Sequence, residues 1–163
     1  MKKMIIIILA GLILTACSRE PGRYYNKDKR FSVKFPTGWQ VKENPGADPD
    51  SDVMVANSPD VSATASVREQ KFTLGMALSP YAKELSQKLG VVKQLEGGIV
   101  KIDGRDAYWM VCDGNGAGPE FTTFYYCLTM EDRIYSVIFI TRTDSFGSRR
   151  AELEGIAQSF KFE

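Results

Sequence analysis

The side chains of this 163-residue chain that could do chemistry by themselves are its three cysteines, Cys17, Cys112 and Cys127. The chain has no histidine, so it lacks the side chain that most often shuttles protons near neutral pH and binds metals. A serine–histidine–aspartate triad therefore cannot form, and no Gly-x-Ser-x-Gly sequence is present. No spacing favours a serine–lysine or paired-carboxylate enzyme either. We expect a protein that is not an enzyme and that binds no cofactor and no metal.

Cys17 follows a short apolar segment at the start of the chain. Lys2 and Lys3 make a cationic start, and residues 4–14 are apolar apart from Gly11, which is the order of regions in an export signal. As a helix this segment would span about 17 Å, short of the roughly 30 Å hydrocarbon core of a membrane. The pattern therefore predicts a cleaved signal peptide rather than a permanent spanning helix.

The last residues of this segment, Leu14-Thr15-Ala16-Cys17, resemble the lipobox of bacterial lipoproteins. Ordinary signal peptidase needs a small residue three positions before the cut, and leucine is too large for it. The lipoprotein pathway accepts leucine there, attaches lipid to the cysteine thiol, and cuts between Ala16 and Cys17. An incidental cysteine in an ordinary signal peptide is the alternative. The resemblance to a lipobox implies that residues 1–16 are removed. Cys17 would then carry two or more acyl chains such as palmitate, which is enough for stable anchoring.

This resemblance implies a protein held at the cell envelope by its N-terminal lipid. Ser18 follows the cysteine, and a residue other than aspartate there favours the periplasmic face of the outer membrane if the source has two membranes. Loss of the signal takes away two of the 21 basic residues and none of the 20 acidic ones, which leaves a net charge of −1. Such a balance gives no support for nucleic-acid binding. The expected partners are the membrane and a protein or other envelope component.

Hydrophobic patterning after the signal predicts one domain. Residues 17–26 are polar and are expected to form a tether, with a single domain over 27–163. A helix is expected from an N-cap at Ser79 to Leu89, with an earlier start near Thr73 as the alternative, and another over 148–159. Apolar alternation or continuous apolar runs predict strands over 31–35, 39–41, 53–56, 61–67, 99–102, 107–112, 121–130 and 134–141. The last two strands lack alternation, which indicates cover on both faces. We therefore expect an α+β fold, an α/β/α sandwich whose mainly antiparallel central sheet is flanked by two main helices.

Three short segments resemble the PsbP-like superfamily, which includes the extrinsic PsbP subunit of photosystem II and bacterial DcrB-type lipoproteins. Residues 31–39 (FSVKFPTGW) are similar to its opening F-x-x-x-x-P-x-G-W, 103–108 (DGRDAY) to its G-x-x-A-Y strand entry, and 156–162 (IAQSFKF) to its closing I-x-x-S-F-x-F. The resemblance implies the sandwich fold and a binding, docking or assembly role without chemistry. It supplies no catalytic residues, and the lipobox favours the DcrB-like branch.

Cys112 and Cys127 are the remaining thiols. An exported protein meets an oxidising compartment, in which two cysteines can pair. A hairpin closed by 113–119 would place them more than about 20 Å apart, whereas a disulfide needs Cα atoms within about 7 Å. Two buried free thiols are therefore favoured over the bond, which stays open as the alternative.

Other candidate ligand residues lie near the start of the expected domain. Asp48, Asp50 and Asp52 have the spacing of a calcium loop but lack its glycine, so an acidic surface loop is favoured. Tyr24 and Tyr25, at the end of the tether, are amphipathic side chains of the kind enriched in binding patches, and we expect them to contact a partner. The sequence thus predicts a membrane-anchored lipoprotein that presents a non-enzymatic PsbP-like binding domain. A hydrolase without histidine and a structural lipoprotein for envelope integrity are the alternatives.

Overall fold

The structure is a computed structural model that describes residues 20–44, 51–71, 77–90, 93–115 and 118–163. Within these ranges the chain forms two helices, α1 (Leu78–Lys88) and α2 (Thr143–Gln158), and ten strands. The strands are β1 (Arg23–Asn26), β2 (Phe31–Lys34), β3 (Gln40–Glu43), β4 (Asp52–Asn57), β5 (Ala63–Lys71), β6 (Lys93–Ile102), β7 (Arg105–Asn115), β8 (Gly118–Met130), β9 (Arg133–Arg142) and β10 (Lys161–Phe162).

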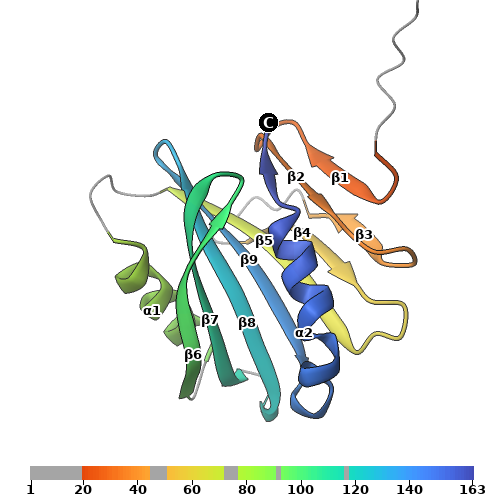
Figure 1. The fold of residues 1–163 in the computed structure, drawn as a ribbon, viewed down its shortest axis with the longest axis vertical. Coiled ribbons are helices and arrows are strands. Elements are labelled where there is room, and N and C mark those ends of the chain that lie inside the picture. The colour runs from red at the N-terminus through yellow and green to blue at the C-terminus, as the bar shows by residue number, and fades with distance from the viewer. Residues whose placement is uncertain (1–19, 45–50, 72–76, 91–92, 116–117) are drawn as a thin grey trace, which may run out of the picture.

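The strands form two antiparallel sheets. The larger sheet has seven strands in the order β3-β4-β5-β9-β8-β7-β6, and the smaller has the order β1-β2-β10. The smaller sheet lies beyond one end of α2, beside the marked C-terminus (Figure 1). Because β10 continues directly from α2 and pairs with β2, the two ends of the domain are joined in one sheet. This sheet positions the first residues of the domain.

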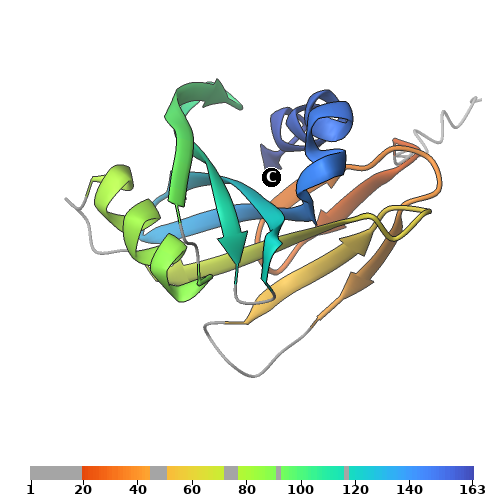
Figure 2. The same ribbon diagram turned by 90° about the horizontal axis from the view of Figure 1, so that it is seen from below.

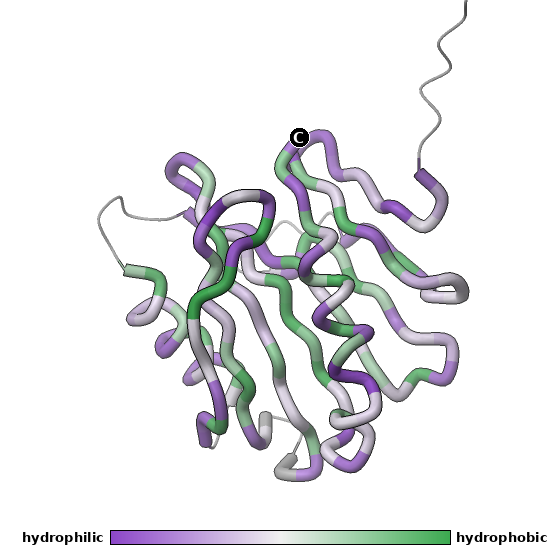
Figure 3. The backbone as a smooth tube through the Cα atoms, in the orientation of Figure 1, coloured by the Kyte–Doolittle hydropathy of each residue, from purple (hydrophilic) through white to green (hydrophobic). Residues whose placement is uncertain are grey.

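The middle strands bury both of their faces. On β8, Phe124 and Tyr126 belong to one apolar cluster, whereas Tyr125 and Cys127 belong to a second cluster on the opposite face. The first cluster includes Leu153, Ile156 and Ala157 of α2, and the second includes Ala82 and Leu85 of α1. Figure 2 shows the two helices on opposite sides of the sheet, and Figure 3 shows apolar segments along the middle strands. The expected α/β/α sandwich is confirmed.

Both helices begin before the main start expected for them, and the start of α1 lies between Ser79 and the alternative near Thr73. The N-cap of α1 is Ala77 rather than Ser79, which lies inside the first turn together with Pro80. A proline there costs no hydrogen bond, because the first N–H groups of a helix have no partner within it. Helix α2 begins at Thr143, five residues before the expected start at Ser148. Neither helix in the described part of the chain is long and apolar enough to cross a membrane.

The strands differ from expectation mainly at their ends. Residues 23–26, which the sequence analysis assigns to the tether, form β1 and pair with β2 from Arg23 opposite Lys34 to Asn26 opposite Phe31. Strand β6 begins at Lys93 instead of Ile99, because pairing with β7 carries the strand through two glycines that interrupt its apolar pattern. The two-residue strand β10 was not expected either. Each of these segments depends on a partner strand rather than on its own residues.

Candidate functional site

A cleft of about 680 Å³ opens beside β1, between the smaller sheet and the segment that leads into β3. This volume lies within the range of small-ligand sites in proteins, roughly 300–1,000 Å³. The side chains that matter most for its chemistry are two cations, three aromatic rings and one proline: Arg23, Lys34, Tyr24, Phe35, Trp39 and Pro21. The cleft is therefore an aromatic site with a basic rim.

Glu20 joins the two cations at the rim. Arg23 and Lys34 lie directly opposite each other on β1 and β2, where two like charges would repel. The carboxylate of Glu20 lies between them, 2.8 Å from Nε of Arg23 and 2.5 Å from Nζ of Lys34. The hydrogen bonds from Lys34 and Arg23 lower the pKa of Glu20 to about 2. This pair of ion pairs, here called the Glu20 clasp, therefore stays ionised at any physiological pH.

Tyr24 forms one wall of the cleft and ties the two sheets together. Its ring packs 6.0 Å from that of Phe31 in the core. Its hydroxyl donates to Oε1 of Glu43 on β3 at 3.1 Å and accepts from Nδ2 of Asn26 at 3.1 Å. Burial, ahead of the effect of Glu43, raises the pKa of Tyr24 to about 12. The phenol is therefore neutral at physiological pH and fixed in orientation.

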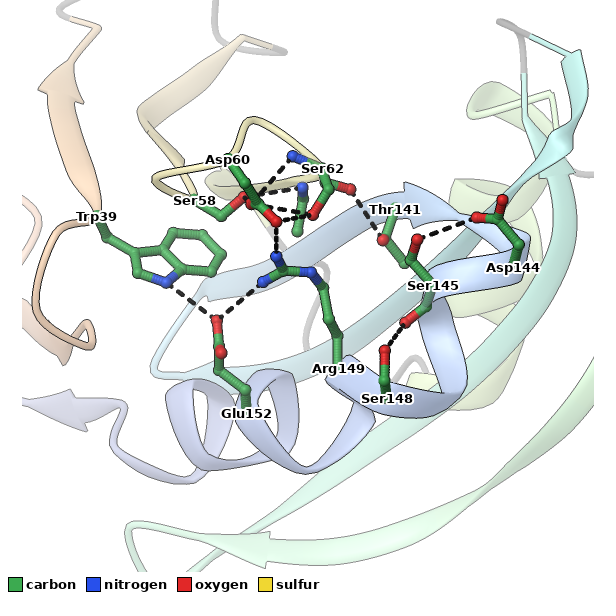
Figure 4. Close-up of polar contacts among 11 residues, drawn as sticks. Trp39, Ser58, Asp60, Ser62, Thr141, Asp144, Ser145, Ser148, Arg149 and Glu152 are labelled. Atoms are coloured by element: carbon green, nitrogen blue, oxygen red, sulfur yellow. Dashed lines mark hydrogen bonds and ion pairs between the residues drawn. The ribbon is translucent and has the colours of Figure 1, made fainter.

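Trp39 forms the opposing wall and is held by α2 (Figure 4). Its ring lies 5.6 Å from the buried ring of Phe35. The indole Nε1 donates to Oε1 of Glu152 at 3.0 Å, and the same oxygen accepts from Nη1 of Arg149 at 3.5 Å. Arg149 in turn forms an ion pair with Asp60 in the turn between β4 and β5. This chain of contacts fixes the indole from the side away from the cleft.

The turn that carries Asp60 is itself hydrogen-bonded. Ser58 donates from Oγ to the carboxylate of Asp60 at 2.7 Å, and Ser62 donates from both its backbone N–H and its hydroxyl. These bonds, together with the charge of Arg149, hold the pKa of Asp60 below its usual range. Gly38, just before Trp39, packs against the same turn. It has φ +90°, and a Cβ there would lie 2.9 Å from Cγ of Pro59. The Pro-x-Gly-Trp segment therefore fits only with glycine.

The lining of the cleft combines aromatic walls with a charged rim. Its ionisable lining residues are Arg23, Lys34 and Tyr24. The two cations are ion-paired with Glu20, and Tyr24 keeps its proton. General acid–base catalysis needs a group that exchanges its proton near the working pH, and the raised pKa takes Tyr24 out of that range. Rigid aromatic walls with a charged rim instead suit the recognition of an amphipathic surface or ligand.

The structure separates the two tyrosines that were expected to contact a partner. Tyr24 lines the cleft, whereas Tyr25 is half-buried on β1 opposite Ser32 and is not part of the lining. Ala16 and Cys17, the expected cleavage and lipidation site, lie outside the described residues.

Of the acidic triplet Asp48, Asp50 and Asp52, the structure describes only Asp52. Asp48 and Asp50 lie outside the described residues, whereas Asp52 forms an ion pair with Arg68 at 3.0 Å. Across the described ranges, no group of three or more acidic or cysteine residues could hold a metal ion.

Cys112 and Cys127 are both free and fully buried beneath α1. Cys112 pairs with Thr123 across the β7–β8 hairpin, so Cys127 lies four residues further along β8, about 14 Å away at strand spacing. Burial raises the pKa of the Cys112 thiol to about 11 and that of Cys127 to about 12. Thiols that stay protonated are poor nucleophiles, so both cysteines are packing residues.

Several cleft residues carry no sequence signal of a site. Phe35 and Trp39 are part of the motif that resembles the PsbP-like superfamily, but that motif indicates the fold and not a binding site. Arg23, Lys34 and Glu20 come together only when β1 pairs with β2. Nothing in the spacing of these three residues predicts an ion-paired cluster.

Comparison with known proteins was informative for structures alone. No family model and no curated protein matches the sequence. The solution structure of cyanobacterial PsbP from Synechocystis matches with a TM-score of 0.65 and 15% identity, covering 86% of this chain and 91% of that one. The chain has a PsbP-like fold. At this identity the likeness establishes the fold and nothing further.

Two other solved structures share this fold. A variant of Mog1 matches with a TM-score of 0.59 and 11% identity, covering 86% of this chain and 94% of that one. LpqN from Mycobacterium tuberculosis, described as involved in cell envelope biogenesis, matches with a TM-score of 0.60 and 11% identity, covering 87% and 85%. The fold of this chain therefore spans most of each of these three structures.

Proposed function

We propose that this chain is a lipid-anchored envelope protein whose PsbP-like domain binds another envelope component without catalysing a reaction. The observation that carries the proposal is the cleft beside β1, which has fixed aromatic walls, an ion-paired rim and a tyrosine whose raised pKa keeps it protonated near neutral pH. The lipobox at Cys17 supports the anchor, and the fold shared with LpqN, a protein of cell envelope biogenesis, supports the setting.

The anchor is tested by metabolic labelling with alkyne-tagged palmitate in a bacterial host. The full-length chain should incorporate label and fractionate with membranes, in the outer membrane if the host has two. Cys17→Ala should abolish labelling and release the protein or leave it as a precursor. Cys127→Ala is the matched control and should label normally, since that thiol is buried. Absence of label from the unaltered chain would contradict the proposal.

The binding role is tested by site-specific photo-crosslinking in intact cells. A photoreactive residue at Thr37, which lines the cleft and is exposed, should give discrete adducts. The same residue at Ser148, exposed on α2 outside the cleft, is the control and should give none. Equal adducts at both positions, or none at Thr37, would mean that the cleft is not the binding site.

A further inference from the structure

The chain joins the domain at Glu20, on the rim of the cleft. Besides the two ion pairs of the Glu20 clasp, the carbonyl oxygen of Glu20 accepts a hydrogen bond from the backbone N–H of Arg23 at 3.1 Å. Two residues after Glu20, the carbonyl oxygen of Gly22 accepts from the backbone N–H of Phe35 at 2.9 Å. The first residues of the domain are thus fastened to β2 before β1 begins.

The covalent chain limits how far this rim can stand from Cys17. Cys17 and Glu20 are three positions apart in the sequence. An extended chain spans at most about 3.5 Å per residue, so their Cα atoms lie within about 11 Å of each other. This limit holds in any conformation. With the lipid of Cys17 inserted in a membrane, the domain can pivot about Glu20, but the rim of the cleft stays next to the lipid headgroups.

The side chains at this end of the domain are those that suit a membrane interface. Tryptophan and tyrosine are enriched at the headgroup level, because their rings are apolar and their polar groups still need partners. In Tyr24 and Trp39 the polar groups are already bonded, to Glu43 and Glu152. The Glu20 clasp sets one carboxylate against two cations, so the clasp carries one net positive charge, which favours anionic lipids.

We propose that the cleft beside β1 faces the membrane that holds the Cys17 lipid and receives its phospholipid headgroups, with the Tyr24 and Trp39 rings at headgroup level. This inference rests on the proposed function, since it requires the lipid anchor, and it names the envelope component that the cleft contacts. A peptide ligand would need no such nearness to the anchor, and it is therefore the less favoured occupant.

The test uses the two tryptophans as matched reporters. Acylated full-length protein, purified from membranes, is reconstituted into vesicles of phosphatidylethanolamine and phosphatidylglycerol with or without doxyl-labelled phosphatidylcholine. Trp109→Phe leaves only Trp39 emitting, and Trp39→Phe leaves only Trp109, which lies on β7, across the larger sheet from β3. Doxyl lipid should quench the Trp39 emission if the indole lies at the membrane interface, and it should leave Trp109 nearly unchanged. Equal quenching of both, or no quenching of Trp39, would overturn the inference.

Further variants separate the clasp from the anchor. Lys34→Gln should reduce the quenching of Trp39 while the protein still floats with vesicles, because the rim loses one positive charge. Lys88→Gln, which removes a cation from α1 outside the cleft, should leave the quenching unchanged. Protein that fails to float with vesicles contradicts the lipid anchor and with it the proposed function. Protein that floats with Trp39 unquenched contradicts this inference alone, and Thr37 adducts to a protein in cells would then identify the cleft as a protein-binding site.

Discussion

Trp39 and Glu152 are 113 positions apart in the sequence and are joined by one hydrogen bond of 3.0 Å, from the indole Nε1 to Oε1. This bond connects the segment before β3 to the exposed side of α2. It also leaves the indole unable to swing away from the cleft. The shape of the cleft therefore depends on the last helix of the chain as much as on the strands that line it.

Loss of this bond should weaken the domain and loosen the indole. Glu152→Ala is expected to lower the free energy of unfolding by about 1 kcal/mol and to shift the emission of Trp39 to the red. Glu152→Gln keeps an oxygen acceptor, so it should cost less and preserve the emission maximum. Urea unfolding and emission spectra in the Trp109→Phe background measure both effects. Identical behaviour of the two variants would show that the hydrogen bond does not fix the ring.

A second prediction concerns Glu69, whose carboxylate is buried between two cations. It lies 2.6 Å from Nζ of Lys29 and 2.5 Å from Nη1 of Arg133, and so joins the turn after β1 to the larger sheet. Glu69→Ala should lower the free energy of unfolding by about 2–3 kcal/mol, because the two partly buried cations lose their shared anion. Urea unfolding at neutral pH measures this loss.

The control for Glu69 is an ion pair on the surface. Asp106 lies 2.7 Å from Lys101, and both side chains are more than 60% exposed. Asp106→Ala should change the free energy of unfolding by less than about 1 kcal/mol, since exposed pairs contribute little. Equal losses for Glu69→Ala and Asp106→Ala would refute the role given to the buried carboxylate.

The raised pKa values of the two buried thiols predict that the protein loses stability in alkali. The pKa values of Cys112 and Cys127 in the folded protein, about 11 and about 12, lie above the ordinary thiol pKa. The contribution of the two protonated thiols to the free energy of unfolding is therefore complete below about pH 8.5. It is lost as pH rises, because the same thiols ionise at lower pH in the unfolded chain than in the folded protein. Between pH 8 and 10 the free energy of unfolding should fall by about 1–2 kcal/mol for each thiol.

The double variant Cys112→Ala/Cys127→Ala isolates this effect. It should be less stable than the unaltered protein at pH 7, because two buried side chains are shortened. Its urea midpoint should nevertheless change less between pH 8 and 10, because the tyrosines that begin to ionise in the unfolded chain near pH 10 are the same in both proteins and only the thiols differ. Parallel pH curves for the two proteins would contradict the raised pKa values.

Two glycines should respond in opposite ways to the same substitution. Gly38→Ala places a Cβ at φ +90° and 2.9 Å from a proline carbon, so it should cost about 2 kcal/mol or more of unfolding free energy. Gly155→Ala lies on the exposed side of α2 with open space around the new Cβ, so it should add about 0.5–1 kcal/mol. Thermal and urea unfolding measure both. A stabilising Gly38→Ala would show that the turn relaxes more readily than its contacts indicate.

The fold was largely predictable because the patterns that encode it are local. The apolar runs over 121–130 and 134–141 predict strands covered on both faces, and β8 and β9 are covered by α1 and α2. The motif at 31–39 correctly points to a PsbP-like fold. Short strands escaped prediction for the opposite reason. β10 holds two residues, too few for a periodic signal, and β1 (RYYN) has no alternation of apolar and polar residues. Both strands exist because β2 lies between them.

What the sequence by itself determined is the α/β/α sandwich, since burial of an apolar face follows from the order of residues along one element. What only the tertiary structure decided is the cleft. Its walls come from β1 and the segment before β3, its clasp needs Arg23 opposite Lys34, and its indole is held by a carboxylate of α2. Ion pairs and hydrogen bonds between distant residues depend on register and on packing across sheets, and no local spacing records them. The cleft therefore became visible only when the strands were placed side by side.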